Sequence, residues 1–232
     1  MTETELREQI CQLAKSIFDR GLTVGSSGNI SVRCDDGGLL VTPTDSCFGR
    51  LDPASLSRFD ATGTLISGDP PTKEMPLHAA FYDSRSQAGA IVHLHATHSV
   101  ALSTLPVDDA ANFLPPLTAY SVMRLGKVAL LPYFRPGDSA VANAIRGLAG
   151  KHSAVMLANH GPVVAEDSLE AAVFAIEELE DIVNGIESEE VDVDELAKKV
   201  ERASKLLNVC SEKLKKTEAE VDQIIEKLND SE

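Results

Sequence analysis

Three histidines in this sequence have the residue type and the spacing of a metal site. His93 and His95 stand two positions apart in AGAIVHLHATHS, an apolar stretch typical of a strand. Alternate residues of a strand point to one face and lie about 6.5–7 Å apart, so two imidazoles there can share one metal ion. His160 is followed by Gly161 and Pro162 in MLANHGPVV and is expected at a strand end, where sites usually open. Three histidines leave zinc a position for substrate or water, as in catalytic sites.

Glu74 is the acidic residue best placed to act beside such a metal. It lies in SGDPPTKEMPLH, where two prolines set a loop and the next residues begin a helix. A carboxylate at a helix N-terminus near a metal suits proton transfer or ligation. Two simpler interpretations remain open, because the HxH pair could face solvent and Glu74 could merely stabilise its helix. His78, His98 and His152 are not expected to be ligands.

Two short stretches are candidates for binding phosphate. Gly25, Gly28 and Asn29 in VGSSGNISV, and Thr42 and Thr44 in VTPTDS, offer N–H and hydroxyl donors without bulky side chains. Each stretch is also compatible with an ordinary turn.

The elements that would position these residues follow from periodicity. Residues 4–20 carry apolar side chains at helical spacing, and Gly21 follows as a helix C-cap. Strands are predicted at GNISVR, GGLLVTPT, GTLISGD, AGAIVHLHA, KVALLPYF and SAVMLANHGPVVA, and helices at about 75–87, 98–105, 138–149 and from 168. This pattern predicts a mixed α/β fold around a central sheet.

The last fifty or so residues have a different pattern. From Leu196 to Leu228 an apolar or small residue recurs at alternating steps of four and three, among mostly charged residues. This heptad predicts a long, coiled-coil-like helix that begins after a cap at Asp192 or Asp194. We therefore expect a catalytic domain at 1–180 and a helical hairpin at 181–232.

Composition and charge exclude several classes of protein. The formal net charge is -15, which argues against nucleic acid as a partner of the catalytic domain because phosphate binding needs clustered Lys and Arg. Cys11, Cys34, Cys47 and Cys210 show neither disulfide nor zinc-ligand spacing. The N-terminal stretch is charged and amphipathic rather than a signal peptide, and no apolar run reaches membrane-spanning length. We expect a soluble cytoplasmic protein without a membrane partner.

Read in order, GNISVR, VTPT, PTKE, VHLHATHS and ANHGPVV resemble the class II aldolase/adducin family over residues 4–180. The stretches SGDPPTKEMPLH, FLPPLTAYSVMRLGKVALLPYFRPGD and MLANHGPVV are most similar to its 3-oxo-tetronate 4-phosphate decarboxylase branch. The resemblance implies a three-layer α/β/α sandwich with a mainly antiparallel central sheet. It also implies a homotetramer with active sites between subunits, and a role in carbohydrate metabolism.

The resemblance also implies roles for particular residues. One Zn²⁺ per subunit would be bound by His93, His95 and His160, with Glu74 as metal neighbour and acid/base. Tyr120 matches a tyrosine that reaches a neighbouring subunit's site. The phosphate pocket would comprise Gly28, Asn29, Thr44, Thr72 and Lys73. Asp45 departs from the aldolases, which have glycine there. By their positions, Arg124 or Arg135 could supply a cation for a substrate carboxylate, and each could equally be a surface or interface arginine.

The implied reaction is metal-dependent decarboxylation of 3-oxo-tetronate 4-phosphate, a carbon-carbon lyase reaction. It would yield dihydroxyacetone phosphate and carbon dioxide through a metal-stabilised enediolate, which Glu74 or water protonates at C2. Retro-aldol cleavage passes through the same enediolate. A fuculose-phosphate type aldolase or a 4-epimerase is therefore the alternative activity.

The C-terminal stretch ELEDIVNGIESEEVDVDELAKKVERASKLL resembles the exodeoxyribonuclease VII small-subunit family. That resemblance implies a helical hairpin that packs on another helix or chain and has no catalytic residues. The junction falls near 177–181, which suggests a fusion protein joined through one helix. The alternative of another class is an engineered fusion in which the enzyme domain serves as a structural assembly module.

Overall fold

The computed structural model describes residues 1–114 and 119–187, with the backbone alone for 119–120 and 185–187. The predicted heptad helix, and the hairpin beyond residue 187, lie outside the described residues. Among the described helices, none is both long and apolar enough to cross a membrane.

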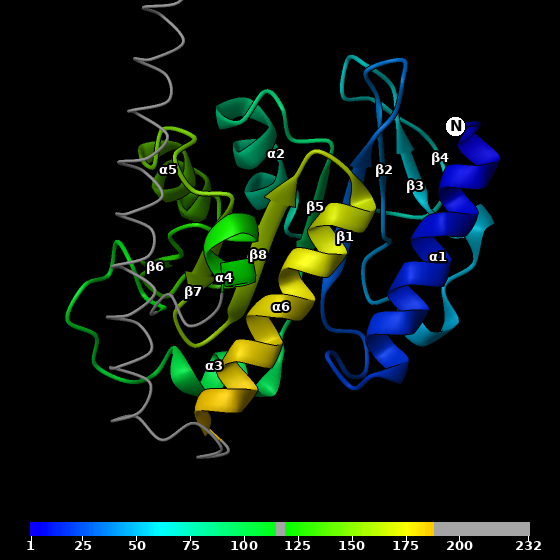
Figure 1. The fold of residues 1–232 in the computed structure, drawn as a ribbon. Helices are drawn as coiled ribbons and strands as arrows, with labels where there is room; N and C mark the ends of the chain where they lie inside the picture. Colours follow the sequence, from blue (N-terminus) through cyan, green and yellow to red (C-terminus); the bar gives the residue numbers. More distant parts are fainter. Residues whose placement is uncertain (115–118, 188–232) are drawn as a thin grey trace, which may run out of the picture. The chain divides into compact units, whose positions relative to one another are not determined.

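A mixed sheet of eight strands forms the centre of the fold (Figure 1). Its strands are β1 (Asn29–Arg33), β2 (Leu39–Val41), β3 (Ser57–Phe59), β4 (Leu65–Ser67), β5 (Ala90–His93), β6 (Ala129–Leu131), β7 (Ala154–Leu157) and β8 (Gly161–Glu166). The spatial order is β4-β3-β2-β1-β5-β8-β7-β6, and every neighbouring pair except β6 and β7 is antiparallel. The predicted mainly antiparallel sheet is therefore confirmed.

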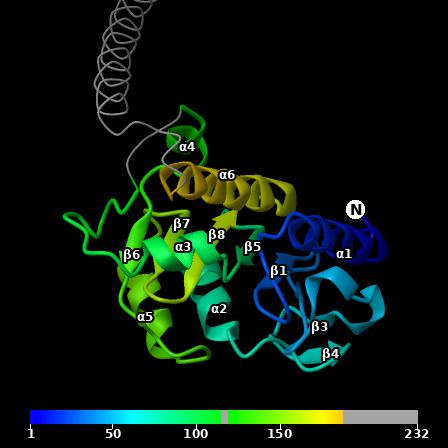
Figure 2. The same ribbon diagram turned by 90° about the horizontal axis from the view of Figure 1, so that it is seen from below.

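In the described part of the chain, six α-helices accompany the sheet. They are α1 (Glu3–Asp19), α2 (Met75–Ser84), α3 (Thr97–Leu102), α4 (Ala119–Arg124), α5 (Ala140–Gly147) and α6 (Leu169–Glu187), with 3-10 turns η1 (Phe48–Arg50) and η2 (Pro53–Ser55). Figure 2 shows α1 and α6 on one side of the sheet and α2 and α5 on the other. The predicted three-layer arrangement is confirmed.

Alternation along the central strands explains the two layers of core. On β5, Ala90 and Val92 pack in the cluster with α1 and α6, whereas Ile91 packs with α2 and α5. On β8, Val164 joins the first cluster, and Val163 joins the second. Because successive strand residues point to opposite faces, both faces of these strands must be apolar and covered. His93 follows this alternation onto the α2 side.

The single strand predicted at SAVMLANHGPVVA is two strands, β7 and β8, separated by the turn that contains His160, and two further elements were not predicted from the sequence. Strand β3 contains only one strongly apolar residue, and its Arg58 is buried because the guanidinium binds Glu3 and Asp36 at 3.0 and 2.5 Å. Helix α4 was not anticipated either.

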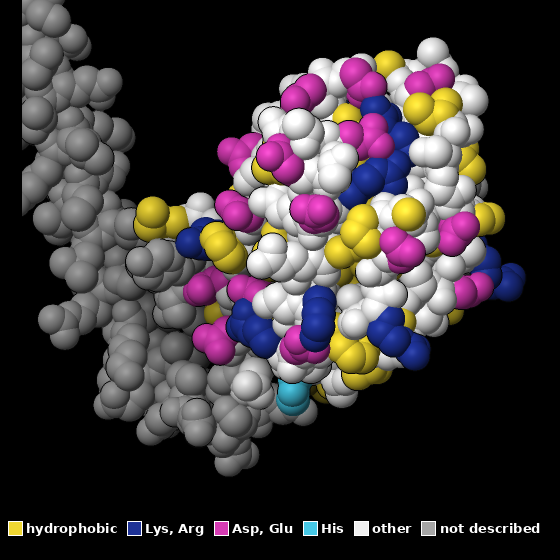
Figure 3. All heavy atoms as spheres, turned by 90° about the vertical axis from the view of Figure 1, so that its right-hand side faces the viewer, with side chains coloured by type: hydrophobic (Ala, Val, Ile, Leu, Met, Phe, Trp, Pro, Cys, Tyr) yellow, Lys and Arg dark blue, Asp and Glu magenta, His cyan; other side chains and the backbone are white. Residues whose placement is uncertain are grey.

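Figure 3 shows acidic and basic side chains interspersed on the face that carries α1.

Gly161 allows β8 to pass close behind β5. Its φ is +144°, and a Cβ there would lie 2.1 Å from the carbonyl oxygen of Leu94. The neighbouring backbone is fixed by a hydrogen bond of 3.2 Å from the Leu94 N–H to the Pro162 carbonyl. Only glycine fits this approach, which keeps the turn containing His160 against the end of β5.

We predict that Gly161→Ala lowers the free energy of unfolding by about 3 kcal/mol or more, because it adds both backbone strain and a clash. Gly147→Ala is the matched control, since Gly147 lies in α5 with nothing within 4 Å of an added Cβ. It should leave the protein equally or slightly more stable. Denaturant unfolding measures both, and equal stability of the two variants would contradict this account.

Glu180 on α6 is a buried acid that forms a hydrogen bond with Ser99 on α3. Burial raises the pKa of the Glu180 carboxyl to about 7, although the Ser99 hydroxyl and His98 act in the opposite direction. A group whose folded pKa exceeds its ordinary value stabilises the fold only at low pH. Its contribution is complete below pH 4.5 and is lost as the pH rises through about 7.

We therefore predict that Glu180→Gln stabilises the protein at pH 8 by about 1–3 kcal/mol and has little effect at pH 4.5. The amide oxygen can still accept from Ser99 without becoming charged. Glu8→Gln, at an exposed position of α1, should give no such pH-dependent difference. Thermal unfolding across this pH range provides the measurement, and a constant effect of Glu180→Gln at both ends would contradict titration of the buried acid.

Candidate active site

Four metal-ligating side chains converge at one end of the central strands. They are Glu74, His93, His95 and His160, whose ligand atoms all lie within 4.8 Å of one another. Glu74 immediately precedes α2, His93 ends β5, and His160 stands in the turn between β7 and β8. His93 and Glu74 are buried, whereas the side chain of His95 is 31% exposed. The centre is therefore deep but reachable.

The three imidazoles face one another through their Nε2 atoms. The Nε2 atoms of His93 and His95 are 3.1 Å apart, those of His93 and His160 3.4 Å, and those of His95 and His160 3.0 Å. The Glu74 carboxylate oxygens lie 3.3 Å from Nε2 of His93 and of His160, and 3.9 Å from that of His95. Ligand atoms of a tetrahedral zinc site with bonds of about 2.0–2.1 Å stand about 3.3 Å apart. This spacing fits a divalent metal ion.

Protonation of the imidazoles also fits metal binding. Nδ1 of His93 lies 2.8 Å from the carbonyl oxygen of Pro162, so Nδ1 donates its proton there and Nε2 is directed at the centre. Burial lowers the pKa of His160 to about 4, and His93 contributes to the same effect. His160 is therefore neutral at pH 7. A neutral imidazole can bind a metal ion through the lone pair of its unprotonated ring nitrogen.

Glu74 is held as a carboxylate. Burial raises the pKa of its carboxyl, but hydrogen bonds and charges from the surrounding histidines lower it well below its usual range. The side-chain amide of Asn29 donates a hydrogen bond of 2.8 Å to Glu74 Oε2. The backbone N–H of Glu74 donates to the Thr72 hydroxyl at 3.2 Å. Asn29 thus orients the carboxylate, and Thr72 fixes the backbone of the same residue.

A buried hydrogen-bond chain extends from Asn29 into the fold. The Asn29 amide oxygen accepts from Nε2 of His78 at 2.5 Å, and Nδ1 of His78 accepts from the Ser31 hydroxyl at 2.7 Å. The Ser31 and Tyr82 hydroxyls are 3.0 Å apart. Burial lowers the pKa of His78 to about 3, which keeps it neutral. His78 is outside the ligand cluster, but it orients Asn29 and, through it, Glu74.

Sequence reasoning missed this chain, although the spacing contained a signal. Asn29 and Ser31 stand two apart on a strand, and His78 and Tyr82 stand four apart on a helix. Each pair therefore lies on one face of its element. The missing information was that these two faces meet.

The residues predicted to bind phosphate lie in neighbouring loops. The Thr44 N–H donates to the Pro70 carbonyl at 2.9 Å, and Pro43 pairs with Pro71, so the VTPT and PTKE stretches run side by side. Lys73 is exposed. Gly28 has φ +87° and lies close to the carbonyl oxygen of His93. Asn29 uses both ends of its side-chain amide within the protein, and the phosphate roles of all these residues stay predictions.

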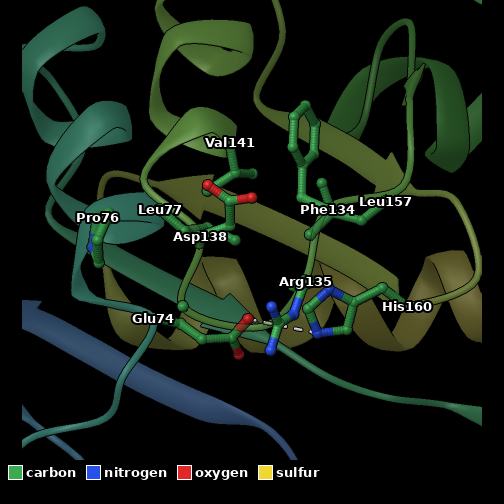
Figure 4. A pocket seen from close by; sticks show the side chains of 10 residues that line it. Glu74, Pro76, Leu77, Phe134, Arg135, Asp138, Val141, Leu157 and His160 are labelled. Atoms are coloured by element: carbon green, nitrogen blue, oxygen red, sulfur yellow. Dashed lines mark ion pairs between the residues drawn. The ribbon is translucent and has the colours of Figure 1, made fainter.

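The remaining predicted residues are placed differently. The Tyr120 side chain lies outside the described residues. The Arg124 guanidinium lies 5.5 Å from the centroid of the Phe174 ring on α6. Arg135, the other candidate for a substrate carboxylate, instead lines a pocket together with Glu74 and His160 (Figure 4).

Comparison with known proteins identifies the family. Residues 8–184 match the family described as Class II Aldolase and Adducin N-terminal domain. The 3-oxo-tetronate 4-phosphate decarboxylase of Cupriavidus necator is 50% identical over 180 residues, which cover 78% of this chain and 82% of that protein. The L-fuculose phosphate aldolase of Escherichia coli is 31% identical over 182 residues, with 78% and 81% covered.

Structural similarity and the C-terminal match complete the comparison. The crystal structure of YgbL, a putative aldolase/epimerase/decarboxylase from Escherichia coli, has a TM-score of 0.76 at 47% identity and covers 78% of this chain and 88% of that one. Residues 175–223 match the family described as Exonuclease VII small subunit. The class II aldolase match spans residues 8–184, and the decarboxylase of Cupriavidus necator is identical to this chain at half of the aligned positions. The chain therefore belongs to the class II aldolase and adducin N-terminal domain family.

Proposed function

We propose that this protein decarboxylates 3-oxo-tetronate 4-phosphate to dihydroxyacetone phosphate and carbon dioxide. The observation that carries the proposal is the convergence of three imidazoles with a carboxylate that Asn29 orients. The 3-oxo-tetronate 4-phosphate decarboxylases of Cupriavidus necator and Haemophilus influenzae are 50% and 46% identical, whereas the L-fuculose phosphate aldolase of Escherichia coli is 31% identical. This difference favours decarboxylation over aldol cleavage.

The metal is proposed to be zinc, held by Nε2 of His93, His95 and His160, because imidazole and carboxylate are zinc ligands at these spacings. Bound there, a divalent cation supplies a Lewis acid for the C3 oxygen of a β-keto acid. The C1–C2 bond breaks, carbon dioxide leaves, and the electron pair remains on C2 and the C3 oxygen. A proton from solvent then adds at C2, which completes dihydroxyacetone phosphate.

Glu74 moves that proton in the proposed reaction. Its carboxylate has a low pKa and is fixed by Asn29, so it accepts a proton only from a close, well-oriented water molecule. The same carboxylate oxygen then returns the proton at C2. Gly28, Thr44, Thr72 and Lys73 are proposed to bind the phosphate, since their loops adjoin Glu74 in the chain and in space.

Further features of the proposal rest on the family resemblance. The protein is proposed to be a cytoplasmic homotetramer of carbohydrate metabolism, in which Tyr120 reaches a neighbouring subunit's site. The overlap of the two family matches at 175–184 supports a fusion between a catalytic domain and a helical, coiled-coil-like segment. The proposed boundary lies near residue 180.

We predict that His93→Ala and His160→Ala each weaken zinc binding by at least about 10–100-fold and abolish measurable carbon dioxide release. His152→Ala is the control, because His152 lies outside the cluster of ligating side chains. Metal content after dialysis against a weak chelator, read by mass spectrometry, tests the ligands independently of activity. Full zinc content in His160→Ala would remove this residue from the proposed site.

The substrate assignment predicts a clear preference in a direct comparison. The purified protein with zinc should release carbon dioxide from 3-oxo-tetronate 4-phosphate at least about 100-fold more efficiently, in kcat/KM, than it cleaves fuculose 1-phosphate. Glu74→Gln should slow turnover by about 10²–10⁴-fold, because proton transfer is lost. Faster cleavage of fuculose 1-phosphate would identify the protein as an aldolase instead.

A further inference from the structure

Arg135 is a permanently charged side chain beside the proposed metal centre. It lies in the loop between β6 and α5, and its side chain lines the same pocket as Glu74 and His160. Figure 4 shows it among the side chains that line this pocket. By contrast, Arg58 and Arg146 form ion pairs with acids of the fold. Among the described residues, no ion pair engages Arg135.

The loop that carries Arg135 is fixed at both ends of its turn. The Asp138 N–H donates to the Arg135 carbonyl at 2.9 Å, and Gly137, at φ +81°, packs against the carbonyl oxygen of Lys73. Asp138 lies in the same pocket, but its Oδ1 accepts a hydrogen bond of 2.8 Å from the N–H of Ala140. The Asp138 carboxylate is therefore engaged by a backbone N–H at the start of α5. The cation is held over the pocket by a defined turn rather than by a flexible loop.

The pocket has an apolar part and a solvent-exposed part. Pro76, Leu77, Val141 and Leu157 line it, and Leu77, Val141 and Leu157 are buried. Arg135 is exposed, so its guanidinium is available to an anion that enters from solvent. The pocket already contains the Glu74 carboxylate and the chain carries a net charge of -15, so an anionic substrate needs a local cation.

We propose that Arg135 binds the C1 carboxylate of the substrate and so makes a 3-oxo acid, rather than a ketose phosphate without a carboxylate, the preferred ligand. This rests on the proposed function. A planar guanidinium matches the two oxygens of a carboxylate with parallel hydrogen bonds. Arg124, the second candidate, lies against Phe174 and does not line this pocket. Of the two arginines, Arg135 is therefore the one that offers a guanidinium to a carboxylate there.

The chemistry determines which kinetic constant should respond. Arg135 neither gains nor loses a proton, and the carboxylate charge that it binds disappears as carbon dioxide forms. The contact is therefore stronger with bound substrate than in the transition state. Loss of the contact should raise KM and leave kcat unchanged or higher.

The experiment compares two ligands that share a phosphate and differ in the carboxylate. The 2,3-dihydroxy acid 4-phosphate lacks the 3-oxo group and cannot decarboxylate, and dihydroxyacetone phosphate lacks the carboxylate. Calorimetry with the zinc-loaded protein should show that Arg135→Gln weakens binding of the acid by about 10–100-fold and changes binding of dihydroxyacetone phosphate less than about twofold. Arg135→Lys should lie between Arg135→Gln and the unchanged protein for the acid, because it keeps the charge but not the bidentate geometry.

Arg146→Gln is the matched control, since Arg146 pairs with Asp83 at the surface and does not line the pocket. Equal weakening of both ligands by Arg135→Gln would assign the residue to the phosphate and overturn the proposal, as would unchanged binding of the acid. Thermal unfolding of each variant separates these results from a folding defect. If the unchanged protein released no carbon dioxide, the proposed function would fail, while the two binding constants would still report on Arg135.

Discussion

The centre depends on the pairing register of three neighbouring strands. On β5, His93 lies opposite Asn29 of β1 and opposite Val163 of β8. Because side chains alternate along a strand, a slip of one residue would turn His93 to the α1 and α6 side. The same register places Asn29 beside Glu74 and leaves His160 at the turn that precedes β8. One set of backbone hydrogen bonds thus positions groups that are far apart in the sequence.

This register brings polar groups together inside the protein, where burial removes their solvation. Hydrogen bonds from surrounding residues offset that loss. A buried carboxylate and imidazole lone pairs would each lose solvation, so each needs a defined partner. Pro162 fixes His93, Asn29 fixes Glu74, and His78 fixes Asn29. From Tyr82 through Ser31 and His78 to Asn29, each group donates a hydrogen bond to the next one. This arrangement requires a neutral His78. Metal binding then completes a site whose ligand directions are already determined by folding.

The sequence predicted the residues of the centre better than the contacts that orient them. The HxH spacing predicted that His93 and His95 share a centre, although β5 ends at His93 and His95 lies beyond the predicted strand geometry. The Gly-Pro pair placed His160 at a strand end, because this is a local rule. The structure brings all of these to Glu74. The link from Asn29 to His78 was not predicted, since it depends on which strand lies under α2. Likewise, only the packing of the β6–α5 loop distinguishes Arg135 from Arg124.

The two family matches overlap within α6. An amphipathic helix allows this overlap because only one of its faces is needed for packing. The catalytic fold uses one face of α6, where Ile176, Leu179 and Val183 are buried, and leaves Asp181 and Asn184 exposed. A second helical sequence can therefore share residues 175–184 if it preserves that face. Through Glu180 the same stretch also bonds to Ser99 on α3, the helix that begins two residues after His95. A shift of α6 would therefore be transmitted through α3 to the metal centre.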